Sequence, residues 1–179
     1  MRVLLDTCVI YPTVMRHVLL SVATRGVFTP LWSARIIEEW RRAALKLGPE
    51  GAAQAEAEAA LLRLQWPNAE VTWPGSLESR LWLPDAADTH VLAAAVSGSA
   101  DVILTLNAKD FPRNILAEEG VSRADPDTYL RGVFEAQPDL VADACAEVLT
   151  EARRLSSAPW EMRALLKKAR LPRLAKAVS

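Results

Sequence analysis

The sequence has little cysteine and little histidine: two cysteines, Cys8 and Cys145, and two histidines, His17 and His90, in 179 residues. Neither pair has the short, regular spacing that Cys/His zinc ligands require. The composition therefore argues against a zinc centre. We expect both cysteines to be reduced residues of the protein core.

Long hydrophobic runs are also absent. Hydrophobic residues make up 51% of the chain, yet no window approaches the roughly 18 uninterrupted apolar residues that a membrane span needs. The apolar run at the N-terminus meets an acid at Asp6, which is untypical of a signal peptide. We therefore expect a cytoplasmic protein with no membrane partner.

No internal repeat and no low-complexity linker divides the chain. Its length suits one α/β core of about 120 to 150 residues plus an appendage. From residue 126 onward the hydrophobic spacing predicts helices only. We predict an α/β domain over residues 1–130 and a C-terminal helical extension over residues 131–179.

The formal net charge is −1, but the charge is unevenly distributed. From Ala152 onward the chain carries eight basic residues and one acid, Glu161. Such a tail is suited to a polyanion or an acidic partner. An ordinary solvated helix face explains it equally well.

Short apolar runs alternate with helical spacing along the first two thirds of the chain. This alternation is typical of a parallel sheet with crossover helices. The runs predict strands at residues 2–5, 27–31, 70–73, 102–106 and 120–122. The spacing predicts helices at residues 13–23, 34–46, 50–65 and 86–97, followed in the tail by 126–135, 138–155 and 160–169.

Acidic residues fall where these predicted elements begin or end. They are Asp6 after the first strand, Glu38 or Glu39 in the helix after the second strand, Asp88 in the opening of a later helix and Asp110 after the central strand. In a parallel sheet all of these positions can lie at one edge, where open α/β folds place their sites. Crowded carboxylates repel one another unless a divalent cation neutralises them. Mg²⁺ and Mn²⁺ prefer oxygen ligands, so we expect one or two such ions here.

Neighbouring residues receive different interpretations. Asp85 is most simply an N-cap of the helix that contains Asp88. His90 lies two positions from Asp88 and points elsewhere, so we interpret it as structural. Thr7 and Thr105 are placed to support the carboxylates by hydrogen bonds.

An ion held by such acids supports the attack of water on a phosphodiester.

Three blocks, in this order and at these intervals, resemble the PIN-domain nucleases. They are VLLDTCVIYP, SARIIEEWRRAA and LPDAADTHVLAAAVSGSADVILTLNAKDFP. Within that family they look like the VapC-type ribonuclease toxins of type II toxin–antitoxin systems. The resemblance covers about residues 1–130, and it implies a Rossmann-like α/β/α sandwich with a short parallel sheet. The tail, with LPRLA near its end, is similar to a C-terminal helical extension of one toxin subgroup.

The resemblance also implies an activity, that of a Mg²⁺- or Mn²⁺-dependent endoribonuclease. Its catalytic and metal-binding acids fall on four residues: Asp6, Glu39, Asp88 and Asp110. Asn107 stands where wider PIN domains often have Asp, and the resemblance includes it among the metal ligands. The implied partners are an RNA substrate, a small DNA-binding antitoxin and a second copy of the chain.

Two other classes of α/β protein also have an acid at the end of the first strand. A haloacid-dehalogenase-like phosphatase also begins with a strand-end Asp, but it needs a second Asp where Cys8 stands. A receiver domain needs an acidic pair, and Leu5 precedes Asp6. Both are disfavoured. The remaining alternative is a PIN fold without catalysis, which serves as a partner-binding or RNA-binding module.

Overall fold

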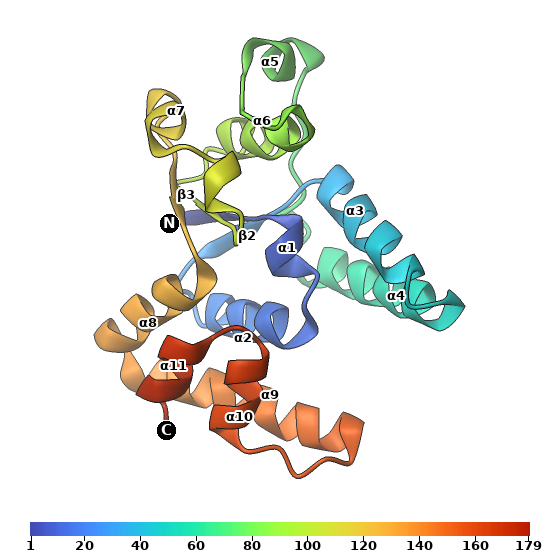
Figure 1. The fold of residues 1–179 in the computed structure, drawn as a ribbon, viewed down its shortest axis with the longest axis vertical. Coiled ribbons are helices and arrows are strands. Elements are labelled where there is room, and N and C mark those ends of the chain that lie inside the picture. The colour runs from blue at the N-terminus through green and yellow to red at the C-terminus, as the bar shows by residue number, and fades with distance from the viewer. The chain divides into compact units, whose positions relative to one another are not determined.

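The computed structural model describes all 179 residues, and they form two compact units. The first consists of Met1–Tyr11 and Thr29–Arg123, and the second of Pro12–Phe28 and Ala124–Ser179. The first unit is α/β and the second is built from helices (Figure 1). Residues 12–28 therefore group with the C-terminal helices, whereas the domain boundary that we expect at residue 130 stays a prediction.

A four-stranded parallel sheet with the order β2-β1-β3-β4 forms the centre of the first unit. Its strands are β1 (Arg2–Leu5), β2 (Thr29–Leu31), β3 (Val102–Leu104) and β4 (Ser122–Ala124). The β1 residue Leu4 pairs with Leu31 on one side and Ile103 on the other, and all three side chains are fully buried. Continuous apolar strands of this kind are typical of parallel sheets. The predicted α/β class is confirmed.

Helices connect these strands. The longer ones are α3 (Ala34–Leu45), α4 (Pro49–Gln65) and α6 (Thr89–Ser97), with short helices α1 (Thr7–Ile10), α5 (Gly75–Arg80) and α7 (Arg113–Glu118) and single 3₁₀ turns η1 (Ala86–Asp88) and η2 (Ala108–Asp110). Ser33 caps α3, because its hydroxyl accepts the Ile36 N–H at 3.1 Å. The apolar side of α3 is buried, and α3 packs along α4 (Figure 1).

Several predicted elements differ from the structure. No strand forms at residues 70–73; a single parallel bridge joins Trp32 to Glu70, and Pro74 follows soon after. The strands expected at 27–31, 102–106 and 120–122 are shorter or shifted, at 29–31, 102–104 and 122–124. The helices α1, α5 and α7 were not predicted. They have four to six residues, which is too short for a helical period to show.

The second unit contains α2 (Thr13–Thr24), α8 (Pro126–Ala136), α9 (Pro138–Ser156), α10 (Met162–Lys168) and α11 (Pro172–Ala177). Cys145 is a free, fully buried thiol of this helical core, as expected. Asp127 of α8 is also buried, and its two oxygens accept the backbone N–H groups of Arg173 and Leu174 at 2.9 Å. A carboxylate thus caps α11, a helix that is not among the elements predicted from the sequence. Nowhere in the chain is a helix both long and apolar enough to span a bilayer.

Candidate metal centre

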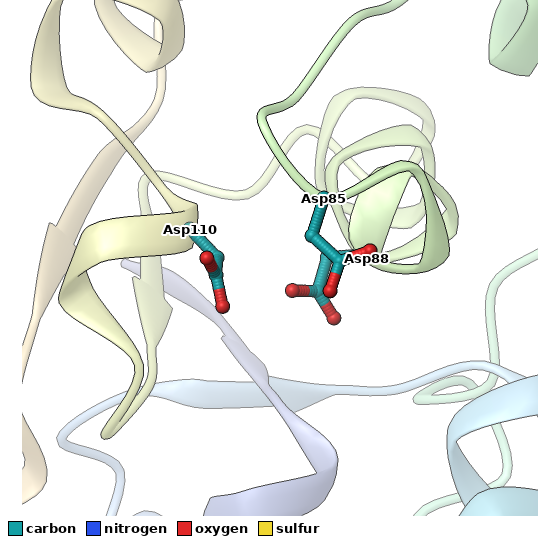
Figure 2. A group of neighbouring side chains, drawn as sticks. All are labelled: Asp85, Asp88 and Asp110. Atoms are coloured by element: carbon teal, nitrogen blue, oxygen red, sulfur yellow. The ribbon is translucent and has the colours of Figure 1, made fainter.

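Three aspartates of the first unit bring their carboxylates together: Asp85, Asp88 and Asp110. One oxygen from each lies within 4.8 Å of the others. Asp85 and Asp88 come from the turn η1 that leads into α6, and Asp110 comes from η2, which follows β3 (Figure 2). The two turns face each other, so acids 22 to 25 positions apart in the sequence form one cluster. Hereafter these three residues are the aspartate cluster.

Asp85 is the member that the sequence interpretation missed. It is an N-cap, as predicted, because its Oδ1 accepts the Ala87 N–H at 2.9 Å. A carboxylate retains further lone pairs after this one bond, and Asp85 also joins the cluster. The signal was the three-residue spacing of Asp85 and Asp88, which places two side chains on one side of a helical turn.

Asp110 is held in place by Asn107. The Asn107 side-chain amide donates a short hydrogen bond to Asp110 Oδ2, and the Asn107 backbone N–H donates to Thr105 Oγ1 at 3.0 Å. Whether Asn107 is itself a metal ligand, as expected, stays a prediction. In the structure its amide serves the cluster by orienting Asp110.

Asp6 lies at the end of β1 and is almost fully buried. Its Oδ1 accepts the Thr7 N–H at 2.7 Å, and its Oδ2 accepts hydrogen bonds from the Thr105 hydroxyl at 2.7 Å and the Cys8 thiol at 3.2 Å. The expected support from Thr105 is therefore present. Asp6 stands outside the aspartate cluster, yet its negative charge raises the pKa of Asp88, so it belongs to the same acidic environment.

Cys8 is not the core residue that we expected, because it is half-buried beside Asp6. Burial and the Asp6 charge raise the pKa of the thiol to about 12. Cys8 therefore stays protonated at neutral pH and acts as a hydrogen-bond donor rather than as a nucleophile.

The adjacent glutamates of α3 have different environments. Glu38 accepts hydrogen bonds from Arg41 and Arg42, and these arginines lower its pKa to about 2. Glu39 accepts the Thr7 hydroxyl at 2.6 Å, and its other oxygen lies 2.7 Å from His90 Nε2. Burial alone would raise the pKa of Glu39, but the contacts with His90 and Thr7 outweigh it and lower the pKa. Glu39 thus faces the residues around Asp6, whereas Glu38 is engaged at the surface.

From the sequence we interpreted His90 as a structural residue. It is 1% exposed, and its approach to Glu39 has the distance of an ion pair without the alignment of a hydrogen bond. The ring therefore links α6 to α3. His90 lies in the first turn of α6, two positions after Asp88, so this contact connects Glu39 with the segment that carries Asp88.

Negative charge accumulates around Asp88. Burial and the charges of three neighbours, Asp6, Asp85 and Asp110, raise its pKa from about 3.8 to about 6, and His90 opposes this rise. Only oxygen donors line the aspartate cluster, and no basic side chain belongs to it. Such a donor set fits Mg²⁺ or Mn²⁺, and a divalent cation would remove the repulsion that raises the pKa.

A parallel α/β fold with clustered carboxylates beyond the ends of its strands is an arrangement that can hold a divalent cation. Comparison with protein families gives the particular class: a model of the PIN domain matches residues 2–109, and the chain therefore belongs to the PIN-domain family. PIN domains are usually metal-dependent nucleases. No curated protein and no solved structure matches the chain.

The Asp88 environment predicts how stability depends on pH. Because folding raises the pKa of Asp88, the contribution of Asp88 to the stability of the metal-free protein is lost as the pH rises from about 4 to about 6, where the folded protein must give up a proton that it holds more tightly than the unfolded chain. We expect Asp88→Asn to raise the free energy of unfolding at pH 7.5 by about 1 kcal/mol, a value reduced for the partial exposure of the group.

Thermal unfolding in EDTA from pH 4 to pH 8 measures this effect. The gain from Asp88→Asn should vanish near pH 4. Asp143→Asn, at an exposed position of α9, removes the same charge and serves as the control. A difference between Asp88→Asn and the parent protein that does not change with pH would contradict the prediction.

Proposed function

We propose that this protein is a Mg²⁺- or Mn²⁺-dependent endoribonuclease that acts in the cytoplasm as the toxin of a toxin–antitoxin pair. The observation that carries the proposal is the convergence of Asp85, Asp88 and Asp110 in a PIN domain, with Asp6 close enough to raise the pKa of Asp88. A surface that only binds a partner has no need for so costly a concentration of like charge.

In this proposal the aspartate cluster and Asp6 hold the ion. Glu39 and Asn107, which were expected among the ligands, act at its border: Asn107 orients Asp110, and Glu39 restrains Thr7 next to Asp6. The bound cation supplies charge neutralisation at the scissile phosphate and the leaving oxygen. The carboxylates place it and leave oxygens free to accept a proton.

The reaction is hydrolysis. A water oxygen forms a bond to phosphorus while the bond between phosphorus and the leaving oxygen breaks. A carboxylate of the site takes one water proton and releases it to solvent, and the leaving oxygen takes a proton from solvent to become a hydroxyl. No covalent intermediate with the protein forms.

The toxin assignment rests on the three sequence blocks that resemble VapC-type toxins. They include Asp6, Glu39, Asp88 and Asp110 as well as the Asn at position 107. In this proposal a small antitoxin, which also binds DNA, inhibits a homodimer of the protein by covering the acidic site. The acidic site then has two alternative occupants, RNA and the antitoxin.

Cleavage of RNA with and without metal tests the enzymatic part. The protein with Mg²⁺ or Mn²⁺ should cleave single-stranded RNA, and EDTA should abolish cleavage. Asp88→Asn and Asp110→Asn should each lower the rate at least ~100-fold, because each removes a charge from the cation site. Asp143→Asn should cleave as the parent does. If the parent in EDTA and Asp88→Asn with metal both cleave as fast as the parent with metal, the proposal is refuted. Binding of RNA without cleavage would favour the non-catalytic module.

The two glutamates of α3 provide a matched pair on one helix. Glu39→Gln should lower the cleavage rate roughly 10- to 100-fold, because it weakens the contacts with Thr7 and His90 that fix the surroundings of Asp6. Glu38→Gln should change the rate little, since Glu38 contacts only Arg41 and Arg42. Circular dichroism checks that both variants fold. A larger loss in Glu38→Gln than in Glu39→Gln would contradict the assignment.

Growth of cells tests the biological role. Induced expression of the parent protein should arrest growth, and Asp88→Asn should not, because the arrest requires cleavage. Co-expression of a small DNA-binding protein encoded next to this gene should restore growth. Normal growth under strong expression of active protein, without that neighbour, would count against the toxin role while leaving the nuclease assignment intact.

A further inference from the structure

One tryptophan of the first unit lies open to solvent. Trp82 is 65% exposed, whereas the other five tryptophans of the chain are buried or half-buried. It lies in the extended segment between α5 and η1, where the neighbours Leu81 and Leu83 are buried. Because side chains alternate along an extended chain, burial of these two leucines directs the indole outward. The core therefore does not need Trp82 as an aromatic residue.

Trp82 borders a pocket of about 460 Å³ within the first unit. Polar side chains dominate its lining; the residues that matter here are Arg80, Trp82, Asn114, Glu118 and Glu119. The lining comes from the segment that carries Trp82 and from α7, which contributes Asn114 and Glu118. A flat aromatic ring beside amide and carboxylate groups suits a planar, polar ligand.

The charges in this pocket indicate which part of a ligand enters. Arg80 donates two hydrogen bonds to Glu119, at 2.7 and 2.9 Å, so its positive charge is neutralised. Glu118 and Asn114 are exposed and have no partner in the structure. The remaining charge is negative, which disfavours a phosphate and favours a neutral ring that carries N–H donors.

The pocket and the aspartate cluster are built from the same two chain segments. Trp82 precedes Asp85 by three residues, a Cα separation of at most ~11 Å. On the other side, Asn114 follows Asp110 by four residues. A strand of nucleic acid with a phosphate at the cluster therefore has a neighbouring nucleotide within reach of the pocket.

We propose that the Trp82 pocket is a base-binding subsite for single-stranded RNA, which takes an unpaired base with an exocyclic amino group, such as adenine or cytosine, next to the scissile phosphate. The inference rests on the proposed nuclease function and adds a determinant of specificity to it. The base stacks on the indole of Trp82, as bases do on aromatic side chains of single-strand-binding proteins. Its exocyclic amino group donates to the Glu118 carboxylate or the Asn114 amide oxygen, whereas uracil has no such group.

Binding to short labelled oligonucleotides tests the subsite without cleavage. The experiment uses the full chain with Asp88→Asn in the presence of Mg²⁺, and fluorescence anisotropy measures the affinity for oligo(A), oligo(C) and oligo(U). We expect tighter binding of oligo(A) and oligo(C) than of oligo(U). Trp82→Ala should weaken binding of the first two roughly 5- to 100-fold, while Trp82→Phe, which can still stack, should retain most of the affinity.

Two further variants separate stacking from recognition. Glu118→Gln should lower the preference for oligo(C) over oligo(U) severalfold, because it weakens the acceptor for the amino group. Leu64→Ala removes a 79% exposed apolar side chain from α4 and should leave all affinities unchanged. Quenching of tryptophan fluorescence by oligo(C) should be lost in Trp82→Ala.

The outcomes distinguish the inference from the nuclease proposal. Unchanged affinity and quenching in Trp82→Ala would overturn the subsite and would assign the exposed indole to a protein interface. Equal binding of oligo(A), oligo(C) and oligo(U) that still depends on Trp82 would overturn the base preference. Absence of RNA binding would overturn the inference altogether. If Trp82-dependent binding is present but the parent never cleaves RNA, the subsite stands and the nuclease proposal fails.

Discussion

Repulsion between carboxylates is the constraint on which the site depends. The three aspartates of the cluster converge where two turns meet, and Asp6 adds a fourth charge close by. The side chains that hold the neighbouring acids are neutral donors: Thr105 and Cys8 for Asp6, and Asn107 for Asp110. Neutral donors fix the direction of a carboxylate without cancelling its charge. The negative charge is therefore preserved for a cation.

The sheet supplies the geometry that makes this convergence possible. Leu5 of β1 pairs with Leu104 of β3, so the next residues along the two strands, Asp6 and Thr105, leave the sheet side by side. The Asp6 N–H donates to the Leu104 carbonyl at 3.1 Å, and the Thr105 hydroxyl bonds the Asp6 carboxylate. A shift of one residue in this register would turn Asp6 to the opposite side of the sheet. The apolar residues of β1 and β3 thus position the acid as well as forming the core.

The α/β class could be predicted from the pattern of hydrophobic residues. The proximity of Asp88 and Asp110 could be predicted because acids fall where the predicted helices begin and the predicted strands end. The resemblance of three blocks agrees with the PIN family that the comparison shows. The sequence pattern could not show that Asp85 is both a helix cap and a member of the aspartate cluster. Capping is a local contact with Ala87, whereas membership of the cluster depends on Asp110, which comes from a distant part of the sequence. Nor could it place Cys8, whose neighbours Asp6 and Thr105 meet only through strand pairing.

The sequence alone did not decide whether Glu38 or Glu39 belongs to the site, and the charged side chains near each glutamate now distinguish the two. Glu38 has arginines three and four positions later, at the spacing where helical side chains meet, and both bind it. Glu39, rotated by one position around the helix, faces Thr7 and His90 instead. An acid that nearby arginines neutralise on its own helix has little charge left for a cation. An acid held by neutral donors keeps that charge, as Asp6 does, whereas Glu39 is held both by the Thr7 hydroxyl and by His90. The partners of a carboxylate, more than its position at the end of an element, therefore indicate which acids belong to the site.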